Sequence, residues 1–183
     1  MEQKYYITED EISERIENLA DSIHIDYEHD SKVVLVGVLK GCIHFLSDLS
    51  RKLCRHFSSI EFAFIRVSSY KGEVRYGKDR QIIVMDNNDV SIEGKVVIIV
   101  DDILDTGRTM KELVTLYSAR NPKSVATCVL LDKKDVREVP IDPDYVGFTV
   151  PNLFYIGYGL DYHEKKREVP YIVGVPYQII DLD

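Results

Sequence analysis

The fold is decided by a stretch that reads Lys95-Val96-Val97-Ile98-Ile99-Val100-Asp101-Asp102-Ile103-Leu104-Asp105-Thr106-Gly107-Arg108-Thr109. The five residues after Lys95 are all Val or Ile. Such an apolar, β-branched run is typical of a strand buried on both faces of a parallel sheet. Three aspartates follow, and apolar residues then recur at helical intervals, at Met110, Leu113, Val114 and Tyr117. The stretch therefore predicts a strand, a polar turn and a helix.

The same alternation extends in both directions along the chain. Strand-like runs are expected over residues 33–38, 60–67, 82–85 and 125–131. Helical patterns follow the capping box Thr8-Glu9-Asp10-Glu11 and occur again over residues 42–54. Strands that alternate with helices predict an α/β fold, with an open, mostly parallel twisted sheet flanked by helices.

The length of 183 residues and the 45% of apolar side chains fit one domain with a substantial core. The tail from Tyr145 onward differs from the rest, because it is rich in Tyr, Gly and Pro and has only short strand-like pieces. We expect one domain over residues 1–183. Its core should span about residues 25–140, with a small hood formed by about residues 1–15 and 145–183.

Charge and cysteine usage exclude several classes of protein. The 31 acidic and 23 basic residues give a formal charge of -8, which offers no overall attraction for nucleic acid or an anionic membrane. No apolar stretch approaches the roughly 18 residues of a membrane span. The three cysteines form no CxxC pair, which fits the reducing cytoplasm. We therefore expect a cytoplasmic protein with no nucleic-acid or membrane partner.

The polar turn after residue 100 is the candidate site. In an open α/β sheet, ligands bind at the carboxyl ends of the strands, where Asp101, Asp102 and Asp105 are expected to lie. Carboxylates there suit a metal or a polyhydroxyl ligand. The following 106–109 segment opens a helix, whose free N–H groups and threonine hydroxyls can hold a phosphate. A plainer alternative is that Asp105 or Thr106 only caps this helix.

The whole stretch resembles the phosphoribosyl pyrophosphate binding motif of the type I phosphoribosyltransferases. Four further segments occur in the order found in the hypoxanthine-guanine members of that family. They are Leu39-Lys40-Gly41, Ser69-Tyr70, Leu131-Asp132-Lys133 and Phe154-Tyr155-Ile156-Gly157-Tyr158-Gly159-Leu160-Asp161-Tyr162. The resemblance covers essentially residues 7–175. The family commonly has Glu-Asp where this chain has Asp101-Asp102, so the first carboxylate is one methylene shorter here.

The resemblance implies a binding site for phosphoribosyl pyrophosphate. Asp101 and Asp102 would meet the ribose hydroxyls, directly or through Mg²⁺, and Lys40, Gly41 and Arg167 would meet the pyrophosphate. The residues that would hold the 5′-phosphate are Asp105, Thr106, Gly107, Arg108 and Thr109. Ser69 and Tyr70 would belong to a lid, for which the polar, glycine-containing segment 68–80 is the candidate.

The resemblance also implies a purine site. Lys133 would donate to the 6-oxo group, Phe154 would stack on the ring, and Tyr155 would read the base edge with its backbone. Asp161 would coordinate a second Mg²⁺. Without the resemblance, Lys133 fits a solvated charged turn, and Phe154 fits a core position.

These assignments predict an enzyme of purine salvage, a glycosyltransferase that makes IMP or GMP from hypoxanthine or guanine. Asp105, next to the purine, would take the proton of the attacking nitrogen. The family usually forms homodimers or homotetramers. One alternative is a phosphoribosyltransferase-like, nucleotide-sensing transcriptional regulator, which should show a basic face or an added helix-turn-helix. Another is a response-regulator-like phosphoacceptor, which leaves the 105–107 segment unexplained.

Overall fold

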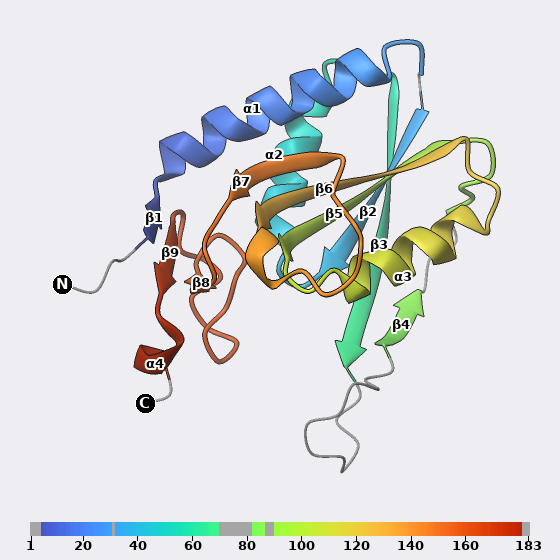
Figure 1. Ribbon diagram of the computed structural model, residues 1–183. Coiled ribbons are helices and arrows are strands. Elements are labelled where there is room, and N and C mark those ends of the chain that lie inside the picture. The colour runs from blue at the N-terminus through green and yellow to red at the C-terminus, as the bar shows by residue number, and fades with distance from the viewer. Residues whose placement is uncertain (1–4, 31, 70–81, 87–89, 181–183) are drawn as a thin grey trace.

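A six-stranded sheet forms the centre of the molecule (Figure 1). The computed structural model describes residues 5–30, 32–69, 82–86 and 90–180. In spatial order the strands are β4 (Ile82–Asp86), β3 (Ser59–Ser69), β2 (Lys32–Leu39), β5 (Val96–Leu104), β6 (Ser124–Asp132) and β7 (Tyr145–Thr149). All neighbours pair in parallel except β4, which runs antiparallel to β3 at one edge. The predicted open, mostly parallel α/β sheet is confirmed.

Helices cover both faces of this sheet. The helices α1 (Glu9–Asp26) and α2 (Ile43–Leu53) pack together on one face, and α3 (Arg108–Ser118) covers the other (Figure 1). Strand β2 shows why its sequence is apolar throughout. Val33 and Leu35 belong to the buried cluster under α1 and α2, whereas Val34 and Val36 belong to the cluster under α3. A strand buried on both sides has no solvent face on which polar residues would alternate.

The predicted capping box at the start of α1 is present. Thr8 Oγ1 accepts a hydrogen bond from the Glu11 N–H, and Glu11 Oε2 accepts one from the Thr8 N–H at 2.8 Å. The two bonds satisfy N–H groups that have no acceptor within the helix. The apolar stripe of α1 faces α2 and the sheet, and it consists of Ile12, Ile16, Leu19, Ala20 and Ile23. No helix in the described ranges is long and apolar enough to cross a bilayer.

A second, antiparallel sheet lies beside the large one and forms the hood. It joins β1 (Tyr5–Ile7), β9 (Ile172–Val175) and β8 (Phe154–Ile156), so the two ends of the chain build it together. A four-residue helix, α4 (Tyr177–Ile180), follows β9. The hood begins later than expected, because β7 pairs with β6 through Val129–Val146 and Leu131–Phe148 and so belongs to the large sheet.

Strand β5 is longer than its apolar pattern predicts. Residues 101–104 were expected in a polar turn, yet the strand continues to Leu104, and Asp101 pairs with Val129 of β6. Backbone hydrogen bonds to β6 hold this part extended whatever the side chains are. Asp101 and Asp102 therefore lie on the last residues of a strand and not in a free loop.

Candidate active site

Asp101 and Asp102 place two carboxyls side by side at the end of β5. Asp101 is only 8% exposed, and its Oδ1 accepts a hydrogen bond from the Asp102 N–H at 3.0 Å. Burial raises the pKa of both carboxyls, and charge repulsion from Asp102 raises the pKa of Asp101 further. The pair therefore favours a cation or a hydroxyl donor as its partner.

Gly41 lies directly against this pair. A Cβ added at Gly41 would lie 1.8 Å from Asp102 Oδ2, so only glycine fits between the end of β2 and β5. The preceding Leu39–Lys40 peptide bond is cis. The structure thus brings the predicted Lys40-Gly41 segment to the predicted carboxylates, although α2, β3 and β4 lie between them in the sequence.

The 105–109 segment turns from β5 into α3 at Gly107. Gly107 has a φ of 85°, in the left-handed region, and an added Cβ would lie 2.6 Å from Ile141 Cγ2. It is the N-cap of α3, and no side chain makes a capping hydrogen bond there. Asp105 therefore does not cap the helix, which removes the plainer interpretation of this residue. The N–H groups of the first turn of α3, which have no acceptor within the helix, lie at the same end of α3 as Asp105.

Arg137 braces this segment and was not found from the sequence. Its guanidinium donates to the Asp105 carbonyl oxygen and to Asp132 Oδ1, and Asp132 is fully buried. The N–H of Glu138 donates to the Thr106 carbonyl oxygen at 2.9 Å, and the Glu138 carboxylate meets Arg108 at 2.6 Å. In the sequence Arg137 stands in a charged turn with no motif, so only the packing shows its contact with Asp105.

Lys133 is buried, with 3% of its surface exposed. Its Nζ lies 3.8 Å from Asp105 Oδ2 and donates to the Tyr177 hydroxyl at 2.9 Å. The same ammonium lies over the Tyr155 ring, 5.6 Å from its centroid. The alternative of a solvated charged turn is thus wrong for Lys133, although it fits the exposed neighbour Lys134.

Aromatic residues of the hood surround this ammonium. Tyr155 is 3% exposed and donates its hydroxyl to the Pro151 carbonyl oxygen at 2.9 Å. Phe154 is partly buried, and Tyr162 and Tyr177 meet its ring edge to face, with centroids at 6.4 and 6.0 Å. Phe154 is therefore not a core residue, because one part of its ring remains accessible.

Asp161 and Arg167 form an ion pair beside the Gly41 segment. Asp161 Oδ1 lies 2.9 Å from an Arg167 nitrogen, and Arg167 also donates to the Gly159 carbonyl oxygen at 2.7 Å. Glu164 joins them to Lys40, whose Nζ lies 2.7 Å from Glu164 Oε2 and holds the pKa of that carboxyl below its ordinary value. Within the described residues, Arg167 Nε is buried and has no acceptor.

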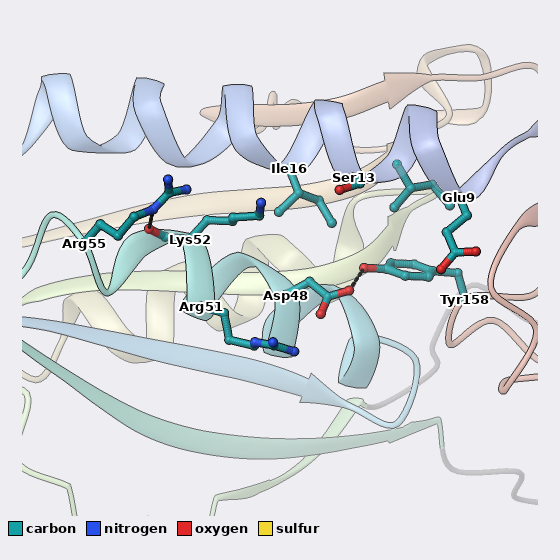
Figure 2. A pocket seen from close by; sticks show the side chains of 9 residues that line it. Glu9, Ser13, Ile16, Asp48, Arg51, Lys52, Arg55 and Tyr158 are labelled. Atoms are coloured by element: carbon teal, nitrogen blue, oxygen red, sulfur yellow. Dashed lines mark hydrogen bonds between the residues drawn. The ribbon is translucent and has the colours of Figure 1, made fainter.

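Tyr158 links the hood to α2. Its hydroxyl donates to Asp48 Oδ2 at 2.6 Å, and Tyr158 itself is 7% exposed (Figure 2). The pair stands at one end of a groove of about 420 Å³ between α1 and α2, which is also lined by Arg51, Lys52 and Arg55. The groove contains none of the predicted site residues. This link was not predictable from the sequence, because Asp48 is one of several polar residues on α2.

Two predicted features stay untested by the geometry. Ser69 ends β3, while Tyr70 and the rest of the predicted lid to residue 80 lie outside the described residues. In the described part of the chain, no three His, Cys, Asp or Glu side chains gather as a metal site.

Known proteins resemble the chain over nearly its whole length. Residues 7–163 match the phosphoribosyl transferase domain family. The hypoxanthine-guanine phosphoribosyltransferase of Dictyostelium discoideum is 42% identical, and that of Aquifex aeolicus is 44% identical; each alignment covers 94% of both chains. A solved hypoxanthine phosphoribosyltransferase variant from Trypanosoma cruzi, in complex with the product IMP, superposes with a TM-score of 0.87 at 39% identity. That match covers 98% of this chain and 93% of the other.

Proposed function

Because the chain belongs to the hypoxanthine-guanine phosphoribosyltransferase family, we propose that it transfers the 5-phosphoribosyl group of phosphoribosyl pyrophosphate to hypoxanthine or guanine. The products are IMP or GMP and pyrophosphate, and the role is purine salvage. The observation that carries this proposal is the 3.8 Å approach of Asp105 Oδ2 to Lys133 Nζ. It gives a proton acceptor and a charged donor within reach of one planar base.

Phosphoribosyl pyrophosphate binds at the ends of β2 and β5. The 105–109 segment holds the 5′-phosphate with the free N–H groups of α3 and with the hydroxyls of Thr106 and Thr109. Asp101 and Asp102 accept hydrogen bonds from the ribose hydroxyls. The pyrophosphate meets Lys40, the Gly41 backbone and Arg167, whose buried Nε has no acceptor among the described residues.

The base binds between Lys133 and the hood. The Lys133 ammonium donates a charge-assisted hydrogen bond to the 6-oxo group. Phe154 offers a partly accessible ring for stacking, and Tyr155 supplies backbone groups to the base edge. Adenine carries an amino group at position 6, which cannot accept this bond. The site therefore favours 6-oxopurines, since an unpaired buried ammonium is costly.

The chemistry exchanges one bond for another at the anomeric carbon of the ribose. The purine nitrogen forms the new bond, the bond to the pyrophosphate oxygen breaks, and positive charge develops on the ribose in between. Asp105 accepts the proton that the attacking purine nitrogen loses. Asp105 is half exposed here, so excluding water during reaction requires a further covering segment, and 68–80 with Ser69 and Tyr70 is the candidate.

The carboxylates suit magnesium. Mg²⁺ is commonly held by one or two carboxylates together with substrate phosphates, so the buried Asp101–Asp102 pair is a sufficient protein contribution. Asp161 already receives Arg167 and the Glu164 N–H, but each of its oxygens keeps a second lone pair. Held there, Mg²⁺ would supply positive charge against the pyrophosphate that leaves.

Self-association and a cytoplasmic location complete the proposal. Phe62 and Phe64 on β3 are each 43% exposed and stack on one another, and this apolar surface suits a homodimer or homotetramer. The exposed Cys54 and the two buried cysteines are free thiols, which fits a reducing compartment. Nothing on the described surface favours the alternative of a transcriptional regulator.

The test is an assay of the purified protein with phosphoribosyl pyrophosphate, Mg²⁺ and each purine base in turn. Hypoxanthine and guanine should give IMP and GMP, with one pyrophosphate released per nucleotide. Adenine should give no comparable product. The proposal is wrong if no 6-oxopurine is converted, or if adenine is converted equally well.

A further inference from the structure

Tyr177 lies against the Lys133 ammonium. Its hydroxyl accepts the only short hydrogen bond that Lys133 Nζ makes among the described residues, at 2.9 Å. Asp105 Oδ2, at 3.8 Å, is too far for a direct hydrogen bond. The Tyr177 ring also lies over the ammonium, 5.4 Å from Nζ to the ring centroid. A buried ammonium needs an acceptor, and in this structure Tyr177 supplies it.

No second acceptor reaches Lys133 unless a covering residue moves. The Lys133 side chain is only 4% exposed, so little of it is open to solvent. Tyr155 is a poor candidate to move, because it is 3% exposed and its hydroxyl is bound to Pro151. Tyr177 is 42% exposed and stands in the four-residue helix α4. Moving it breaks one hydrogen bond, the contact of its ring with the ammonium and one edge contact with Phe154.

We propose that Tyr177 competes with the purine for Lys133. The Tyr177 hydroxyl accepts the Lys133 hydrogen bond that the 6-oxo group of a bound base would accept. The inference rests on the proposed base-binding role of Lys133. A base binds only to molecules in which Tyr177 has left Lys133, so the apparent affinity falls by the fraction of molecules in that state. Because this fraction is a property of the protein, it lowers the affinity for hypoxanthine and guanine by the same factor.

The test compares Tyr177→Phe with the parent protein. The substitution keeps the ring and removes the competing acceptor, so the KM for hypoxanthine and for guanine should both fall, by roughly 10-fold each. The KM for phosphoribosyl pyrophosphate and the turnover should not change. Tyr171→Phe is the matched control, since Tyr171 is an exposed tyrosine of the same tail that contacts Tyr6 instead of Lys133. It should change none of these constants.

Tyr177→Ala and the parent protein distinguish a failure of the proposed competition from a failure of the proposed function. Tyr177→Ala removes the ring as well and should also lower both base KM values. A raised base KM in either variant would show that Tyr177 lines the base site and helps binding, and an unchanged KM would show no competition. Unequal changes for hypoxanthine and guanine would also overturn the inference. If the parent converts no 6-oxopurine, the proposed function itself has failed.

Discussion

The 105–109 segment and the surroundings of Lys133 solve two binding problems in different ways. The first is continuous in sequence and takes its shape from one strand end, one glycine and one helix start. The second is assembled from Lys133, directly after β6, and from residues of β8 and α4, so no short stretch of sequence contains it. A phosphate can thus be held by local backbone geometry, whereas a base needs side chains brought together by packing.

Asp105 belongs to both regions, and its removal should have the largest effect. Asp105→Asn keeps the size of the side chain and removes the proton acceptor, so turnover should fall by roughly 10²–10⁴-fold. Steady-state kinetics with hypoxanthine measure this. Asp135→Asn changes an exposed aspartate in the short 3-10 helix after Lys133; it is the control and should behave as the parent does. Near-normal turnover of Asp105→Asn would show that the proton goes elsewhere.

Lys133→Ala tests the binding of the base separately from the binding of phosphoribosyl pyrophosphate. Lys133→Ala removes a charge-assisted hydrogen bond, so kcat/KM for hypoxanthine should fall by roughly 10- to 150-fold, or about 1.5–3 kcal/mol. The KM for phosphoribosyl pyrophosphate should stay near the parent value. The neighbouring Lys134 is exposed, and Lys134→Ala is therefore the matched control. Equal losses in the two variants would point to a general charge effect.

Gly107→Ala tests the phosphate side through the backbone of the 105–109 segment. Gly107→Ala places a side chain on a residue with a positive φ, and the new Cβ also clashes with the Ile141 and Arg137 side chains. The resulting strain is about 1–3 kcal/mol. The KM for phosphoribosyl pyrophosphate should rise by roughly 10-fold, because the 105–109 segment shifts. Gly94→Ala is the control, since Gly94 has a φ of 69° and open space around it. If both variants raise that KM, the effect lies in overall stability.

Tyr158 tests the link between the hood and α2, with the smallest expected effect on activity. Burial and the nearby Asp48 charge raise the pKa of Tyr158 above the ordinary value near 10. The folded protein therefore keeps a proton that the unfolded chain loses, so stability falls as pH rises above about 10. Tyr158→Phe should make that fall shallower by about 1.4 kcal/mol per pH unit. Urea unfolding at several alkaline pH values measures the slope, and identical slopes would contradict the assigned bond.

The sequence predicted features that depend on neighbours in the chain. The apolar run before Asp101 gave a buried strand, and Thr8-Glu9-Asp10-Glu11 gave the start of α1. Both predictions rest on the spacing of neighbouring residues along the chain. The strand nevertheless continued to Leu104, because pairing with β6 outweighs the polar character of Asp101 and Asp102.

Features made by contacts distant in sequence were not predictable. The burial of Lys133 depends on Tyr177, which is 44 residues away, and the link from Tyr158 to Asp48 spans 110 residues. The turn around Lys133 looks solvated in sequence, since charged residues follow it. Only the covering hood changes its environment. The resemblance to a family was needed to suggest a role for Lys133.

If the two regions bind two different substrates, the KM values for both substrates should separate in Lys133→Ala and Gly107→Ala. We expect Lys133→Ala to raise the KM for hypoxanthine with little change for phosphoribosyl pyrophosphate, and Gly107→Ala to do the reverse. If each variant raises both KM values to a similar extent, the regions do not divide the substrates as described.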